Sequence, residues 1–249
     1  MDEQERSILN KRYNNIISLG FFCSVAQELE KYGFRNASYP FDWLISDFKG
    51  VIEVIERDFK DFLNYDYLSQ MAVNPKYYIN TAYGFQFYHD FNAYQPLSTQ
   101  LNDVRKKYNR RINRFYKNIT KPTLFVRYIE NEVEFKWIEE NYIRIRELLK
   151  SFNPNKEIVY ITNDEYSSTV FKAFYVEKDE GDTVARQPFS KSEELMSFFK
   201  NVDYLNNEKS TVLNLRKRLI RRFRTIKSKL NSDKNNIEIY IHEKQYPST

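Results

Sequence analysis

Residues 123–163 constrain the fold more than any other part of the sequence. Two apolar runs, TLFVRYI at 123–129 and EIVYITN at 157–163, flank EFKWIEENYIRIRELLK at 134–150, whose apolar residues recur at helical spacing. A helix of this length between two nearly continuous apolar strands is typical of a βαβ unit, in which the strands are parallel and covered on both faces. We therefore predict a three-layer α/β domain with a mostly parallel sheet.

An earlier stretch, IISLGFFCSVAQELEKYG at 16–33, reads as a short strand, a turn and a helix. Gly20 ends the apolar run, and the helical spacing begins next to the only cysteine, Cys23, and ends at Gly33. Free N–H groups and the dipole at a helix N-terminus favour a thiolate, and the same N–H groups could hold an oxyanion. Cys23 is therefore a candidate nucleophile. The alternative is a small apolar residue in a strand-to-helix turn.

Polar residues follow the predicted parallel strands where each strand ends. Arg127 lies at the end of the strand at 123–129, and Asn163 and Asp164 follow the strand at 157–163. Ligands bind at the carboxyl ends of strands in an open parallel sheet. Because the turn with Cys23 follows the first strand, we expect Cys23, Arg127 and Asn163 along one edge of the sheet.

The middle of the chain carries further candidates. Residues 76–91, KYYINTAYGFQFYHDF, predict a β-hairpin, and His89 lies at the end of its second strand. Asp42, between Phe41 and Trp43, is either a helix cap or a placed carboxylate.

A long polar helix is predicted from Pro96 to about Asn118. Its residues Arg110, Arg111 and Arg114 fall at i, i+1 and i+4 and can present a cluster to a carboxylate or a phosphate. The alternative is a solvated helix face.

Composition excludes several classes of protein. With one cysteine the chain has no internal disulfide, the charged N-terminal residues do not resemble a signal peptide, and no window approaches the 18 apolar residues of a membrane-spanning helix. We expect a cytoplasmic protein. The sequence contains no glycine-rich phosphate-loop or dinucleotide motif, no H-E-x-x-H and no cysteine pair, so we expect no cofactor and no metal site.

The basic charge is concentrated near the C-terminus. The chain has 39 basic and 34 acidic residues, and residues 209–230 hold nine of the basic ones and no acidic one, so the remainder is slightly acidic. Nucleic-acid binding is therefore not expected of the domain at 1–205. The segment at 206–249 is predicted to contain a basic helix with a narrow apolar stripe, Val212, Leu215, Leu219, Phe223, Ile226 and Leu230. This pattern is typical of a helix on an anionic membrane surface, here the inner face, or of a helix that packs on a partner or on its own domain, and binding to nucleic acid is the less favoured third alternative.

Five short motifs together resemble a known family. They are SLG-x-x-C at 18–23, FDW at 41–43, HDF at 89–91, Y-x-RR-x-x-RF at 108–115 and LFVR at 124–127. They are similar, in order and spacing, to a bacterial family of unknown function described as papain-like cysteine peptidases. The resemblance implies Cys23 as nucleophile, His89 as base, and Asp42 or Asp90 as the orienting acid. It also implies an association with gene clusters for cell-surface polysaccharide.

Two classes of function stay open. In the first, Cys23 and His89 carry out acyl transfer or hydrolysis, with His242 as the alternative base. A papain-like core would place the base on an antiparallel sheet, whereas the βαβ unit favours a Rossmann-like or SGNH-hydrolase-like sheet, in which the substrate could be a sugar ester as well as a peptide. In the second class, a glycan-assembly transferase or sugar-phosphate-binding protein, Cys23 is structural and a phosphate is bound by the arginines at 110, 111, 114 and 127.

Overall fold

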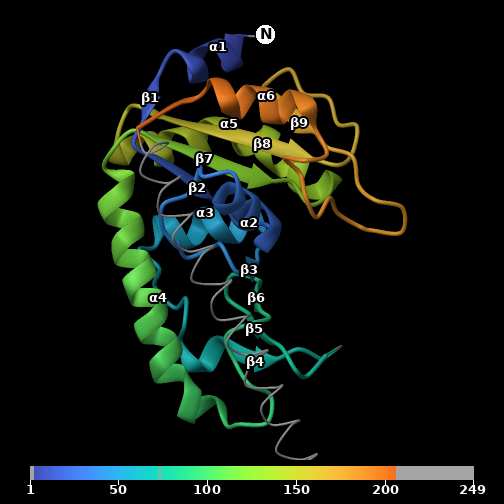
Figure 1. The fold of residues 1–249 in the computed structure, drawn as a ribbon. Coiled ribbons are helices and arrows are strands. Elements are labelled where there is room, and N and C mark those ends of the chain that lie inside the picture. Colours follow the sequence, from blue (N-terminus) through green and yellow to red (C-terminus); the bar gives the residue numbers. More distant parts are fainter. Residues whose placement is uncertain (1–2, 73, 206–249) are drawn as a thin grey trace, which may run out of the picture. The chain divides into compact units, whose positions relative to one another are not determined.

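The computed structural model describes residues 3–72 and 74–205 (Figure 1). The chain divides into two units, residues 1–207 and 208–249, and the described residues belong to the first. The predicted basic helix at 209–230 and His242 lie outside the described residues.

The main sheet is parallel throughout, as the βαβ pattern predicts. It contains β2 (Asn15–Ser18), β7 (Thr123–Tyr128), β8 (Lys156–Thr162) and β9 (Ala173–Tyr175), in the order β2-β7-β8-β9. The helix α5 (Glu132–Phe152) makes the crossover from β7 to β8. The carboxyl ends of the four strands therefore meet at one edge, where the turn with Cys23 begins.

Helices cover both faces of this sheet, which gives the predicted three layers (Figure 1). One face packs against α1 (Glu3–Leu9), α2 (Cys23–Lys31) and α6 (Glu193–Asn201), and the opposite face packs against α3 (Phe48–Glu56) and α5. Successive strand residues point to opposite faces. On β7, Val126 and Tyr128 pack with the α2 side, whereas Phe125 packs with the α3 and α5 side.

The predicted hairpin is part of a larger antiparallel sheet. Its two strands are β5 (Tyr78–Asn80) and β6 (Phe85–Phe87), as expected, and the sheet adds β3 (Leu44–Ile45) and β4 (Leu68–Gln70) in the order β3-β6-β5-β4. A 3-10 turn, η1 (Tyr65–Tyr67), precedes β4, and β1 (Arg12–Tyr13) and β10 (Asp203–Tyr204) form a separate parallel pair.

The long helix α4 (Leu97–Ile119) packs against both sheets, and Figure 1 shows it running alongside them. At the middle of α4, the Tyr108 ring lies against Phe87 of β6 and against Phe62, which precedes β4. Near its C-terminal end, Phe115 contacts Phe125 of β7. Because aromatic rings bury large apolar areas, this row of rings joins the two sheets into one core.

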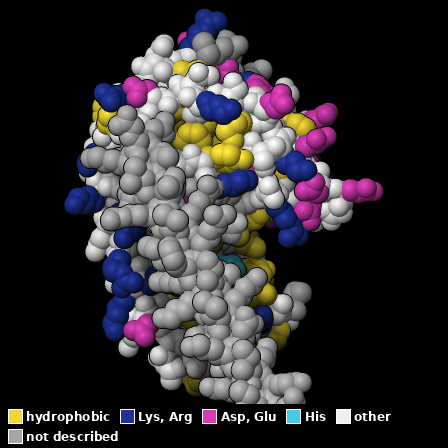
Figure 2. Space-filling view, viewed as in Figure 1, with side chains coloured by type: hydrophobic (Ala, Val, Ile, Leu, Met, Phe, Trp, Pro, Cys, Tyr) yellow, Lys and Arg dark blue, Asp and Glu magenta, His cyan; other side chains and the backbone are white. Residues whose placement is uncertain are grey.

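Charged side chains are unevenly spread over the face drawn in Figure 2. Lys and Arg side chains are spaced along the α4 side, whereas acidic side chains gather over the loop that follows β9. Within residues 3–72 and 74–205, no helix is long and apolar enough to cross a membrane.

Candidate active site

Cys23 is the first residue of α2, as the sequence predicts. The turn before it is fixed from two sides: the N–H of Tyr128 donates to the carbonyl of Gly20 at 3.3 Å, and the N–H of Ser46 donates to the carbonyl of Phe21 at 2.7 Å. Gly20 has a φ of +85°, and a Cβ there would lie 2.2 Å from the Ser46 hydroxyl oxygen. Glycine is thus required for this turn to bring Cys23 to the edge of the sheet.

The N-terminus of α2 offers free hydrogen-bond donors beside the thiol. The preceding residue, Phe22, supplies no side-chain cap, and the first N–H groups of a helix have no acceptor within it. The hydroxyl of Ser24, the second helical residue, is buried and has no hydrogen-bond partner among the described residues. This end of the helix can therefore hold a negatively charged oxygen next to Cys23.

The state of the thiol differs from the expectation. Cys23 is half-buried, and burial raises the pKa of its thiol, a rise that a backbone hydrogen bond at Cys23 only partly opposes. This rise is opposite to the lowering that a helix N-terminus favours, because loss of solvation outweighs the N–H groups. Cys23 rests as a neutral thiol, and a nucleophilic role requires a base.

His89, the predicted base, follows β6 and is exposed. Its imidazole lies against the ring of Trp43, edge to face, with ring centroids 6.5 Å apart. Among the described residues no hydrogen bond joins this imidazole to the Cys23 thiol, so the structure does not contain the direct contact expected of a formed thiol–imidazole pair.

The two candidate orienting acids are both engaged elsewhere. Asp90 forms an ion pair with Lys107 and accepts a hydrogen bond from the Tyr108 hydroxyl at 2.9 Å, both from α4. Asp42 is completely buried, accepts from the N–H of Tyr39 at 2.7 Å and pairs with Arg35 at 3.0 Å. Neither carboxylate is hydrogen-bonded to His89 in the described part of the chain.

Burial changes the ionisation of Asp42. It raises the pKa of this carboxyl to about 6, against the lowering effect of Arg35 and of the Tyr39 N–H. One of its oxygens, Oδ1, has no partner within the described residues, and neither has Nη1 of Arg111, whose positive charge also acts on Asp42. Asp42 is thus the centre of a buried charge cluster next to Trp43.

The four arginines predicted to bind an anion do not form one surface. Arg110 is exposed, whereas Arg111 and Arg114 turn toward the loop at 35–43, where Arg114 donates to the carbonyl of Ser38 at 2.6 Å. Arg127 is completely buried and donates to both oxygens of Glu134, at 2.8 and 2.5 Å, and to the carbonyl of Ser46 at 2.7 Å. The grouping of Arg127 with the helix arginines is therefore not found.

The predicted shared edge is only partly confirmed. Cys23, Arg127 and Asn163 do follow or end parallel strands at the same edge, but Arg127 faces the α5 side, where it pairs with Glu134. Its neighbour Tyr128 faces the α2 side instead. The Tyr128 hydroxyl donates to Asn163 at 2.5 Å and accepts from the N–H of Ala185 at 2.9 Å, and its ring contacts Phe22 beside Cys23.

Sequence reasoning missed two residues of this region. Tyr128 lies within an apolar strand, and only the alternation of side chains between the two faces of the sheet separates its position from that of Arg127. Arg35 was hidden in an irregular loop, although its side chain is almost fully buried and bonded on all sides. A lone arginine after a helix carries no periodic signal that would reveal burial.

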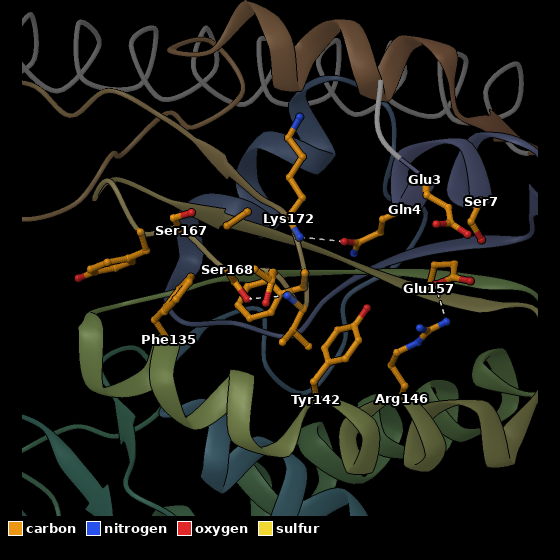
Figure 3. A pocket seen from close by; sticks show the side chains of 15 residues that line it. Glu3, Gln4, Ser7, Phe135, Tyr142, Arg146, Glu157, Ser167, Ser168 and Lys172 are labelled. Carbon is orange, nitrogen blue, oxygen red and sulfur yellow. Dashed lines mark hydrogen bonds and ion pairs between the residues drawn. The ribbon is translucent and has the colours of Figure 1, made fainter.

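A separate cavity of about 700 Å³ lies between α1, α5 and the loop before β9 (Figure 3). Its wall includes the rings of Phe135, Tyr142 and Phe171. Three of its charged side chains form ion pairs: Arg146 with Glu157, which also pairs with Lys11, and Lys172 with Glu5 and Glu194. None of the predicted site residues lines it.

The described residues also contain no group of three or more His, Cys, Asp or Glu side chains that could hold a metal ion.

Comparison with known proteins places this site in a family. A relative from Acanthamoeba polyphaga mimivirus, "Uncharacterized protein R408", is 30% identical over 120 residues, which cover 40% of this chain and 54% of the relative. The chain thus spans about half the length of that relative. No solved structure matches the chain. The model of the family described as "Putative papain-like cysteine peptidase (DUF1796)" matches residues 14–157, which are more than half of the chain and include Cys23, Asp42, His89, Asp90 and the four arginines, and the chain therefore belongs to this family.

Proposed function

We propose that the protein is a thiol-dependent hydrolase or acyl transferase in which Cys23 attacks a carbonyl carbon. The observation that carries this proposal is the position of Cys23: a half-exposed thiol on the first residue of α2, at the carboxyl edge of a parallel sheet, beside uncapped N–H groups. This position supports a nucleophile and an oxyanion site within one turn.

The raised pKa of Cys23 determines the form of the reaction. A neutral thiol needs a base as the carbonyl approaches, and His89 is the candidate. The imidazole takes the thiol proton while sulfur bonds to the carbonyl carbon, and the resulting oxyanion is held by the N–H groups of α2. Collapse to a thioester expels the leaving group, which takes the proton from the imidazolium. Water or another acceptor then releases the acyl group by the same steps in reverse.

This chemistry requires His89 to approach Cys23 more closely than in the resting structure. His89 is exposed, and catalytic hydrogen bonds are often long without substrate and shorten in its presence. The substrate is a carbonyl compound that a thiol can attack, either a peptide amide or a sugar ester. The sequence resemblance implies a role in cell-surface polysaccharide synthesis, and we include that role in the proposal.

Acylation of Cys23 by p-nitrophenyl acetate tests the proposal. We expect a single acetyl adduct on Cys23 by mass spectrometry and none in Cys23→Ala. The acylation rate of His89→Gln should be lower by at least about 10²-fold, because general-base catalysis contributes about 10²–10⁴. His242→Gln is the matched control and should acylate at the wild-type rate. Equal rates in wild type and His89→Gln, or loss of acylation only in His242→Gln, would contradict the assignment of His89.

The alternative, a sugar-phosphate-binding protein or glycan-assembly transferase, receives less support. Of the four arginines that it requires, Arg127 is buried in an ion pair with Glu134, and Arg114 already donates to Ser38. Of the four, Arg110 alone is exposed to solvent, and Arg111 is half-buried.

A further inference from the structure

The helix that carries Cys23 and the loop that precedes β3 are held together by one buried arginine. Arg35 donates from Nη1 to the carbonyl of Ala26 in α2 at 2.9 Å, from Nε to the carbonyl of Ala37 at 2.7 Å, and from Nη2 to the Ser38 hydroxyl at 2.7 Å. It also pairs with Asp42 at 3.0 Å, and its side chain is 3% exposed. All three nitrogens are used, so the guanidinium has one fixed orientation.

This guanidinium also lies against Trp43. Its central carbon is 5.7 Å from the centre of the Trp43 ring, within the range of a cation–π contact. The same ring contacts the His89 imidazole edge to face, with centroids 6.5 Å apart. The contacts therefore run without interruption from α2 through Arg35 and Trp43 to His89.

We propose that Arg35 and Trp43 are positioning residues that keep the resting His89 imidazole against the Trp43 ring, from which it approaches Cys23 when substrate binds. This inference rests on the proposed function for its meaning in catalysis. The structural basis of this proposal is a pair of contacts. The exposed His89 side chain packs against the Trp43 ring, and Arg35 fixes that ring relative to α2. Lysine cannot replace Arg35 here, because one ammonium cannot reproduce a planar fork that bonds in several directions and covers a ring.

The first readout is the proton NMR signal of the His89 imidazole in the His242→Gln background, where one histidine remains. The Trp43 ring should displace this signal from its position in an exposed histidine. Trp43→Leu should remove the displacement, and Arg35→Lys should reduce it. The matched control is Trp137→Phe: this second tryptophan packs on Phe48 of α3, and its loss should leave the signal in place. An unchanged signal in Trp43→Leu and Arg35→Lys would overturn the proposal.

The second readout is the rate of Cys23 acylation by p-nitrophenyl acetate as a function of pH. Trp43→Leu and Arg35→Lys should each lose about tenfold to hundredfold, since misplacing a reacting group by about 1 Å can cost about 10². Combining Trp43→Leu with His89→Gln should cost no more than His89→Gln alone, because both remove the same contribution. Additive losses would show that Trp43 acts on stability rather than through His89.

These two readouts separate failure of the inference from failure of the proposed function. If wild-type Cys23 is not acylated, the proposed function fails, and the NMR signal still decides whether Arg35 and Trp43 hold His89. If acylation depends on His89 but not on Trp43 or Arg35, the function stands and the inference fails. Should Arg35→Lys not fold, the half-buried Trp43 supplies the decisive variant.

Discussion

Individual buried charges in this protein show how burial and pairing decide chemistry. Arg35 and Arg127 are both buried, and each is paired with a carboxylate, Asp42 and Glu134, because an unpaired buried charge is costly. No charge from the described residues opposes burial at Cys23, so burial keeps its thiol neutral. Lys156 differs from the two paired arginines, because its amine is buried and has no hydrogen-bond partner among the described residues.

The titration of Cys23 is the first residue-scale prediction. Because burial raises its pKa, the rate of alkylation by iodoacetamide should reach half its maximum at a higher pH in the folded protein than in the same protein in urea. Since the chain has one cysteine, mass spectrometry reports this site alone. A lower midpoint in the folded protein would mean that the N-terminus of α2 outweighs burial.

The second residue-scale prediction concerns the effect of replacing Lys156 on stability. Burial lowers the pKa of this amine to about 7, and its nitrogen lies over the Phe152 ring without a hydrogen-bond partner in the described structure. Below pH 7 both folded and unfolded chains bind the proton, so the folded state carries the full cost of a buried ammonium. Between about 7 and 10.5 only the unfolded chain is protonated, and this cost declines as pH rises.

Lys156→Met should therefore raise the free energy of unfolding by about 1–3 kcal/mol, the cost of a buried unsatisfied polar group, below pH 7, and by less toward pH 10. Urea unfolding at several pH values measures the difference. Lys121→Met, at an exposed position, is the control and should change stability little. A gain that is independent of pH would indicate better packing rather than relief of a charge.

At the scale of elements, the site depends on where α3 and the antiparallel sheet meet. Gly50, within α3, lies against the hairpin so closely that a Cβ would be 2.2 Å from the carbonyl oxygen of Tyr83. That hairpin continues through β6 to His89, and β3 places Trp43 beside it. Close approach of α3 to the hairpin thus supports the strands that carry the candidate base.

Gly50→Ala tests this packing. Alanine is favoured over glycine in a helix by about 1 kcal/mol, but the contact with the Tyr83 backbone should reverse the sign, because overpacking typically costs about 1–3 kcal/mol. We expect a net loss in the free energy of unfolding. The control is Lys49→Ala, at the preceding, exposed position of α3. If Gly50→Ala instead stabilises the protein, the hairpin can move away from α3 freely.

For the whole molecule, the function of residues 209–230 remains a prediction from the sequence. Nine basic residues and no acidic one occur there, and each basic residue near an anionic bilayer contributes about 1 kcal/mol, weakened by salt. The full chain should sediment with anionic but not with neutral vesicles, and high salt should release it.

The control for this experiment is a variant with Arg218, Arg221, Arg222 and Arg224 changed to glutamine, which should lose binding. If wild type binds both kinds of vesicle equally, or if the variant binds as well as wild type, the segment instead packs on protein.

The sequence alone determined the parallel sheet, because two apolar strands around a helix leave few ways to bury their surfaces. It also placed Cys23 at the start of α2, since a strand, a glycine turn and a helix are local features. Only the tertiary structure decided the environment of each side chain. Arg127 and Tyr128 are neighbours in sequence, but strand alternation sends one to Glu134 and the other to Asn163. Burial, which raises the pKa of Cys23 and encloses Arg127 against Leu19 and Ser46, depends on segments far apart in the chain, and no local pattern contains it.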